Sequence, residues 1–238
     1  MIRVGTSGYN YPAWRGSFYP ERLAAPRMLP FYAERFGTVE INATFYRMPT
    51  PKTIAGWAQA TPPDFVFSLK APQRITHFSR LAGVEDALRF LAETARGLGA
   101  KLGPLLFQLP PSFRKDTGRL AGVLEQLPPD LRVAFEFRHP SWFADDVYAL
   151  LRGRDAALCI VDTKEGTTAD VATASWGYVR LRDRAYPEAE LTAWAASLAR
   201  AGWREAFAYF KHEDSGLGPA LAAQLVARLP PPAPVTSR

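Results

Sequence analysis

The chain alternates between short apolar segments and longer segments in which apolar residues recur every three or four positions. The short segments predict β-strands over residues 2–7, 38–46, 65–71, 103–109, 132–138, 157–163, 176–182 and 205–212. Helical spacing and helix-start residues predict helices over residues 84–98, 142–151, 188–201 and 219–229, among other helix-compatible stretches. Strands and helices that alternate in this way indicate a series of βαβ units.

Eight such units in 238 residues predict an α/β fold, a single TIM-type (β/α)8 barrel, because barrels of this type typically contain about 250 residues. An open doubly wound sheet is the rival fold, and it usually carries a G-x-G-x-x-G loop after its first strand. The first strand here runs instead into Gly5-Thr6-Ser7-Gly8-Tyr9. We expect the barrel domain to span residues 1–229 and the proline-rich residues 230–238 to form a disordered tail.

The composition, 47% hydrophobic and 22% charged, is that of a globular protein and excludes a largely disordered chain. No stretch approaches the ~20 apolar residues that span a bilayer, and the first residues do not resemble a signal peptide. We therefore expect a cytoplasmic protein with no membrane partner. Cys159, the single cysteine, lies in an apolar strand, where we expect it to act as a small hydrophobic residue rather than a nucleophile.

Strand residues alternate between two faces, and several polar side chains fall on the face that should point into the barrel. In segment 38–46 these are Glu40, Asn42, Thr44 and Tyr46. On the other strands they are Ser7, Lys70, Gln108, Glu136, Arg138, Asp162, Arg180 and Lys211. Active sites of TIM barrels lie at the carboxyl ends of the strands, so this set predicts a functional pocket. The competing interpretation is a buried salt-bridge network; ionisable groups on six strands are costly to bury without purpose, which favours the pocket.

The inward cations outnumber the inward carboxylates by four to three. The cations are Lys70, Arg138, Arg180 and Lys211, and the carboxylates are Glu40, Glu136 and Asp162. Arginine forks match the oxygens of carboxylates and phosphates. We therefore predict a small anionic ligand, such as a sugar phosphate or a nucleotide, in keeping with the net charge of +6.

Three inward residues are candidates for catalysis. Glu40 and Glu136 have the chemistry of an acid/base pair, suited to hydrolysis or to the proton abstraction of an isomerase. Lys70 is either a Schiff-base lysine or a salt-bridge partner of Glu136.

The cofactor is not determined by the sequence. An oxygen-rich set suits magnesium or manganese: Glu40, Glu136, Asp162 and His139. Four nearby cations compete for these carboxylates, which argues against a divalent metal. His77, in a loop, is either a site residue or a loop cap.

Several motifs resemble the domain-of-unknown-function 72 (DUF72, YecE-like) family. They are Gly5-Thr6-Ser7-Gly8-Tyr9, Val39–Tyr46, Phe67–Pro72 with Ile75-Thr76-His77, Leu105–Pro111, and Phe135–His139 with Ser141-Trp142. The resemblance covers nearly the whole chain and implies a TIM-type barrel. It implies no reaction, because no activity is established for the family.

The C-terminal third departs from the family pattern at five positions. They are Arg182, Asp183, Lys211, His212 and Leu221, where the family usually has His, Gly, Asn, Asn and Asn. These substitutions add positive charge and point to a more anionic ligand in this chain.

Three functions are compatible with these observations. The first is an enzyme that acts on a small phosphorylated or sugar-like substrate in the barrel mouth. The second is a nucleic-acid-binding protein or nuclease, in which bases stack on the aromatic residues of segment 9–19, although a packed loop that covers the barrel explains the same residues. The third is a barrel that binds a metabolite without catalysis.

Overall fold

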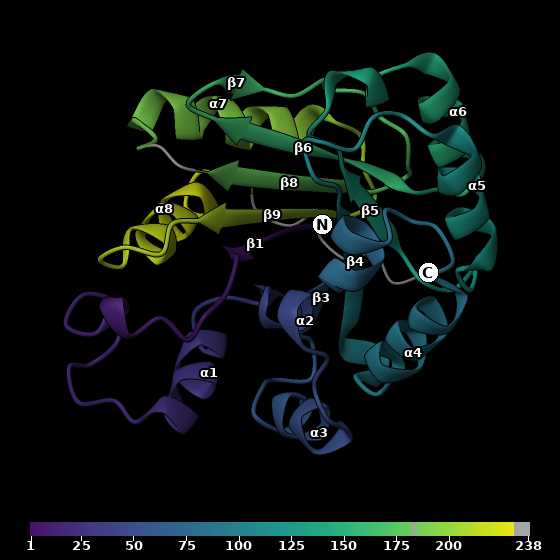
Figure 1. The fold of residues 1–238 in the computed structure, drawn as a ribbon. Helices are drawn as coiled ribbons and strands as arrows, with labels where there is room; N and C mark the ends of the chain where they lie inside the picture. Colours follow the sequence, from purple (N-terminus) through teal and green to yellow (C-terminus); the bar gives the residue numbers. More distant parts are fainter. Residues whose placement is uncertain (183–184, 231–238) are drawn as a thin grey trace, which may run out of the picture.

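Eight parallel strands form a nearly closed barrel with helices around its outside (Figure 1). The computed structural model describes residues 1–182 and 185–230. The strand order in this part of the chain is β1-β9-β8-β6-β5-β4-β3-β2, and a ninth, two-residue strand, β7, pairs antiparallel to β6. The fold is the predicted α/β (β/α)8 barrel.

The described elements follow one another as expected for βα units. The strands are β1 (Ile2–Thr6), β2 (Thr38–Ile41), β3 (Val66–Lys70), β4 (Leu102–Gln108), β5 (Val133–Glu136), β6 (Ala157–Thr163), β7 (Gly166–Thr167), β8 (Gly177–Arg182) and β9 (Ala206–Lys211). The α-helices are α1 (Ala25–Ala33), α2 (Ala43–Tyr46), α3 (Pro51–Gln59), α4 (Glu85–Arg96), α5 (Thr117–Gln126), α6 (Asp145–Gly153), α7 (Glu188–Arg200) and α8 (Leu217–Val226). Short helical turns are η1 (Pro12–Trp14), η2 (Arg74–Phe78), η3 (Gly99–Lys101) and η4 (Pro140–Trp142).

The barrel closes where β1 meets β2. A parallel bridge joins Ser7 to Glu40, and the Gly8 amide donates to the Glu40 carbonyl at 2.7 Å. A Cβ atom on Gly5 would lie 2.2 Å from the carbonyl oxygen of Thr38, much closer than real Cβ contacts. Glycine at this position therefore permits the close approach of the first and second strands.

Two predicted elements differ from the structure. The strand predicted over residues 38–46 ends at Ile41, where pairing with Leu69 of β3 also ends, and the chain turns into α2. A longer strand would leave its backbone hydrogen-bonding groups without a β3 partner. In the described segment between β6 and β8, residues 164–176, no helix occurs, and β7 replaces it. This crossover is an exception to the predicted βα alternation.

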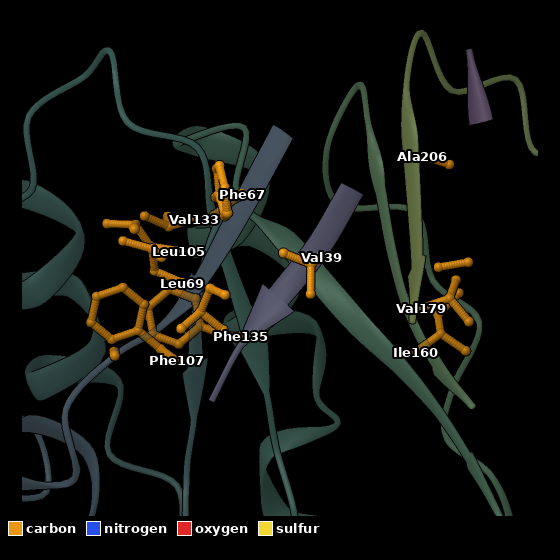
Figure 2. Close-up of a cluster of buried hydrophobic side chains, with 14 of the residues drawn as sticks. Val39, Phe67, Leu69, Leu105, Phe107, Val133, Phe135, Ile160, Val179 and Ala206 are labelled. Carbon is orange, nitrogen blue, oxygen red and sulfur yellow. The ribbon is translucent and has the colours of Figure 1, made fainter. Parts of the chain in front are cut away.

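Apolar side chains form two clusters on opposite sides of the strands. The larger cluster lies between strands and helices and contains Val39, Leu69, Phe107, Phe135 and Ile160 (Figure 2). The smaller cluster fills the barrel interior. It contains strand residues of the opposite face, together with Trp176 just before β8: Val66, Leu106, Ala134, Ala157, Cys159, Val161, Trp176, Tyr178, Phe207 and Tyr209. Cys159 is 1% exposed, as expected for a small core residue.

Two of the predictions made from the sequence concern residues outside the described part of the chain. Of the proposed tail, residues 231–238 are outside it, as is Asp183 among the family departures. No helix in the described part of the chain is long and apolar enough to cross a membrane.

Candidate active site

Arg180 of β8 connects two carboxylates across the barrel interior. Its side chain is 1% exposed. Nη1 donates to Glu136 Oε2 at 2.5 Å, whereas Nη2 donates to Glu40 Oε1 at 2.8 Å and to Ser7 Oγ at 3.2 Å. The predicted inward residues of β2, β5 and β8 therefore meet in one network with Ser7, which directly follows β1.

Glu40 is held on both carboxylate oxygens. The Ser7 hydroxyl donates to Oε1, and the Tyr178 hydroxyl donates to Oε2 at 2.7 Å. Asn42 Nδ2 donates to Ser7 Oγ at 2.6 Å and so extends the network toward the mouth. Burial raises the pKa of Glu40, but Arg180 and these hydrogen bonds outweigh it, so the pKa lies below its ordinary value.

Glu136 is surrounded by donors in a similar way. Its Oε1 accepts from Gln108 Nε2 at 2.7 Å and from Arg138 Nε at 3.1 Å, and Arg182 Nη1 lies 3.8 Å away. Burial raises the pKa of Glu136, but Arg180, Arg138 and Arg182 outweigh burial and hold the pKa at about 2. Both candidate acid/base carboxylates are therefore ionised and enclosed.

Lys70, at the end of β3, lies beside this network without joining it. Its side chain is 8% exposed, and Nζ lies 4.0 Å from the centroid of the Phe45 ring. In residues 1–182 and 185–230, Nζ makes neither a hydrogen bond nor an ion pair, so the expected alternative of a Lys70–Glu136 salt bridge is not formed. Burial and the nearby Arg180 lower the pKa of Lys70 to about 7.

Cavities open at the carboxyl ends of the strands. One, of about 330 Å³, is lined by Gly8, Tyr9, Asn10, Tyr11, Ile41, Asn42, Ala43, Tyr46, Trp57, Lys70, Lys211 and Glu213, and we call it the lysine cavity. A second, of about 570 Å³, is bordered by Glu136, Arg138 and Arg182 together with the β7 hairpin. The predicted mouth is therefore hollowed and bordered by cations.

Tyr46 and Lys211 border the lysine cavity, although by different routes. Tyr46 is 74% exposed on α2 rather than inward on a strand. Lys211 is half-buried at the end of β9, and its Nζ lies 3.8 Å from Glu213 Oε1. Burial, Arg182 and Arg180 lower the pKa of Lys211.

The predicted histidines lie in turns near the mouth. His77 of η2 is edge-on to Phe45 and shares a 2.9 Å hydrogen bond with Thr76 Oγ1. Burial and the nearby Lys70 lower the pKa of His77. His139 precedes η4, where its Nδ1 accepts from the Ser141 amide at 3.2 Å. His139 thus has a local capping contact.

The expectation that Asp162 points into the barrel is wrong. On β6, Cys159 and Val161 belong to the interior cluster, whereas Leu158 and Ile160 pack toward the helices. Asp162 shares the parity of Leu158 and Ile160, and its Oδ1 accepts from Thr167 Oγ1 at 2.6 Å. It therefore holds the β7 hairpin on the outer side of β6.

The aromatic loop after β1 is mostly packed against the barrel. Trp14 is fully buried and Tyr19 is 1% exposed, and both rings contact Phe18. Tyr9 and Tyr11 are half-buried and border the lysine cavity. The packed-loop interpretation is confirmed for Trp14 and Tyr19, whereas Tyr9 and Tyr11 are the aromatic residues of this loop that border the cavity.

The sequence interpretation missed several residues of the site. Tyr178 has the same inward parity as Arg180, so its contact with Glu40 had a signal in the strand pattern. Trp57 and Glu213 reach the lysine cavity from α3 and from the loop after β9, where strand alternation has no bearing.

No metal centre is formed by the acidic residues of the site as they stand. Among the described residues, no group of three or more His, Cys, Asp or Glu side chains is placed to hold a metal ion. Glu40 and Glu136 instead bind the arginine.

Sequence comparison gives the relatives of the chain. A family model described as "Protein of unknown function DUF72" matches residues 3–237. UPF0759 protein YecE of Escherichia coli (strain K12) is 31% identical over 145 residues, which are 60% of this chain and 51% of that protein. UPF0759 protein YunF of Bacillus subtilis (strain 168) is 30% identical over 158 residues, 62% of this chain and 54% of that protein. The aligned part of the chain spans about half the length of these curated relatives.

Structure comparison agrees with the family assignment. A DUF72 family protein from Thermotoga maritima has a TM-score of 0.82 and 26% sequence identity, over 95% of this chain and 98% of that one. A protein named SacUVDE has a TM-score of 0.63 at 9% identity, over 95% of this chain and 97% of that one, a likeness of fold alone. The match over residues 3–237, with these relatives, shows that the chain belongs to the DUF72 family, whose function is unknown.

Proposed function

We propose that the protein is an enzyme that acts by acid/base chemistry on a small anionic substrate, phosphorylated or sugar-like, at the carboxyl end of the barrel. The observation that carries this proposal is the state of Lys70. Its amine borders a cavity, lacks a carboxylate partner among the described residues, and has a pKa of about 7. A group that titrates near neutral pH is well matched to proton transfer.

Proton transfer falls to Lys70 because the two carboxylates are otherwise engaged. Glu40 and Glu136 are 0% and 1% exposed, and each is bound to Arg180. In this proposal Glu40, Glu136 and Arg180 are positioning residues. They form a fixed cluster of charges at the base of the barrel mouth.

The anionic group of the substrate would lie among the cations that reach the mouth. Lys211 borders the lysine cavity together with Lys70, while Arg138 and Arg182 border the adjacent cavity. Lys211 and Arg182 are two of the departures from the family pattern. An anion in this position gains charge-assisted hydrogen bonds in a partly buried site.

Ligand-induced stabilisation tests the proposal. The probes are inorganic phosphate, ribose 5-phosphate and glucose 6-phosphate, each followed by thermal unfolding. A ligand at 100 times its Kd adds about 2.7 kcal/mol to the unfolding free energy. We expect a sugar phosphate to stabilise the wild type and to lose this effect in Lys211→Met.

The matched control is Lys115→Met, which removes a lysine paired with Asp146 on the surface. This variant should bind as the wild type does. The absence of any shift with all three probes, or an equal shift in Lys211→Met, would overturn the proposal. Binding without turnover of the stabilising sugar phosphate would favour the metabolite-binding alternative.

A further inference from the structure

We propose that Lys70 is a nucleophile that forms an imine with the carbonyl carbon of a hydroxylated aldehyde or ketone bound in the lysine cavity. This inference deepens the proposed function and rests on it for the anionic group of the substrate. It assigns to Lys70 a covalent role in place of proton transfer alone.

The position of the amine is the first observation. Lys70 is more than nine-tenths buried, yet its side chain borders the lysine cavity. The Nζ atom lies over the Phe45 ring, 4.0 Å from the ring centroid. A buried amine beside an aromatic face and a cavity is accessible to a ligand while shielded from bulk water.

The surrounding charges explain why the Lys70 amine forms no ion pair with the nearby carboxylates. Arg180 of β8 forms ion pairs with both nearby carboxylates, Glu40 of β2 and Glu136 of β5. Lys211 of β9 adds a second positive charge near Lys70. Burial and these cations disfavour the ammonium form, so the lone pair on Nζ is available near neutral pH.

Lys211, Lys101 and Lys115 lack this combination. Lys211 borders the same cavity, but its Nζ lies 3.8 Å from Glu213 Oε1. Lys101 donates to the carbonyl oxygens of Ala58 and Thr61, and Lys115 donates to Asp146. At pH 7 about half of the Lys70 amines are neutral, whereas an ordinary lysine with a pKa near 10.4 has only about one neutral amine in 2,500.

An unpartnered acceptor points to a hydroxyl on the ligand. The Oδ1 atom of Asn42 is buried and has no hydrogen-bond partner among the described residues, while Nδ2 is fixed by its bond to Ser7. Asn42 lines the lysine cavity with Lys70. A ligand hydroxyl near the carbonyl would donate to this oxygen and satisfy it.

The chemistry balances without an oxidant or a reductant. The Nζ lone pair forms a bond to the carbonyl carbon as the C=O π pair moves to oxygen, and one amine proton is transferred to that oxygen. The resulting carbinolamine loses its hydroxyl with the second amine proton as water, and the nitrogen lone pair forms C=N. One carbonyl compound and one amine give one imine and one water.

Reductive trapping tests this inference on the wild-type protein itself. The protein is incubated with glycolaldehyde phosphate or with neutral glycolaldehyde, plus sodium cyanoborohydride, at pH 7.5, and labelled lysines are located by peptide mass spectrometry. We expect Lys70 to be labelled at least about ten-fold more than the exposed Lys52. Labelling of Lys70 no greater than that of Lys52 would overturn the inference.

Two variants provide the controls. Lys70→Met should lose the preferential label, and Lys52→Met should retain it. Since an unfolded Lys70→Met protein would also lose the label, its thermal unfolding is recorded in parallel, and the comparison of lysines within the wild type stands independently of it.

The two probes separate this inference from the proposed function. Equal labelling by glycolaldehyde and its phosphate supports the imine and counts against the anionic substrate. Sugar-phosphate binding that depends on Lys211, with no preferential label at Lys70, supports the proposed function and rejects the imine.

Discussion

Glu40 and Glu136, on strands that are not neighbours, are bound by opposite nitrogens of a single guanidinium, that of Arg180. The oxygen–nitrogen distances are 2.8 and 2.5 Å, and all three side chains are at most 1% exposed. Two negative charges and one positive charge are therefore enclosed together. Arg138 and Arg182 approach Glu136 from the mouth, and their two positive charges exceed the one negative charge that remains.

Replacement of Arg180 by Met should destabilise the barrel severely. The substitution leaves two buried carboxylates without their shared cation, and the loss of one partner of a buried ion pair costs about 3–5 kcal/mol. Urea unfolding at pH 7 measures the effect. The triple variant Glu40→Gln, Glu136→Gln, Arg180→Met should regain much of the loss. The prediction is contradicted if Arg180→Met is as stable as the wild type, or if the triple variant is no more stable than Arg180→Met. Either result would show that the ion pairs of Arg180 with Glu40 and Glu136 do not stabilise the folded protein.

Replacement of Lys70 by Met should stabilise the protein at neutral and acidic pH. The pKa of Lys70 is about 7 in the folded protein against 10.5 ordinarily, so the folded state carries the full cost of a buried ammonium below pH 7. This cost disappears as the pH rises from 7 to 10.5, because unfolding then takes up a proton. The gain should reach at most about 5 kcal/mol, since one pKa unit corresponds to about 1.4 kcal/mol. Urea unfolding between pH 6 and 10 tests both the size and the slope, and a gain that grows with pH would contradict the assignment.

Glu136 should contribute to unfolding by acid. Its pKa of about 2 in the folded protein, against 4.5 ordinarily, gives a stabilisation that is complete above pH 4.5 and is lost as the pH falls toward 2. Relative to Glu136→Gln, the wild type should lose about 3 kcal/mol over that range. Parallel pH dependences of the two proteins would show that Glu136 is not held ionised by its arginines.

The close contact between β1 and β2, where the barrel closes, gives a prediction on packing. Gly5→Ala places a methyl group against the Thr38 carbonyl and should cost about 1–3 kcal/mol by overpacking. The matched control is Gly122→Ala in α5, where nothing lies within 4 Å and alanine favours the helix by about 1 kcal/mol. Thermal unfolding should therefore shift in opposite directions in the two variants, and shifts of the same sign would contradict this account of barrel closure.

Salt dependence distinguishes an enclosed anion from an extended nucleic acid. Binding of ribose 5-phosphate with one phosphate contact should weaken by no more than about four-fold between 50 and 200 mM salt. An oligonucleotide that makes six phosphate contacts should weaken by about a thousand-fold over the same range. Titrations of both ligands at the two salt concentrations make the comparison. If only the oligonucleotide binds, the basic surface is the functional element.

The alternation of residues along a strand correctly predicted which side chains point into the barrel when only one face of the strand carries polar residues. Glu40, Lys70, Glu136 and Arg180 were assigned inward from this pattern, and they lie in or beside the central network. The pattern failed at Asp162 because β6 is apolar on both faces, as is usual for a buried parallel strand, so its sequence carries no parity signal.

The pairing of side chains within the site could not be predicted in the same way. Whether Lys70 or Arg180 binds Glu136 depends on the reach and direction of each side chain across the barrel interior. Strand spacing does not encode that reach, and the cavity residue Trp57 comes from a helix outside the strand pattern altogether.

The crossover between β6 and β8 forms one wall of the mouth from a hairpin and a loop instead of a helix. Residues 164–168 of the β7 hairpin border the cavity that also contains Arg138 and Arg182. The hairpin pairs with β6 at Asp162 and Thr163, the last two residues of that strand. The side chains that hydrogen-bond to Arg180 come from other segments, so a substitution within residues 164–168 changes the border of this cavity and removes none of the Arg180 hydrogen bonds.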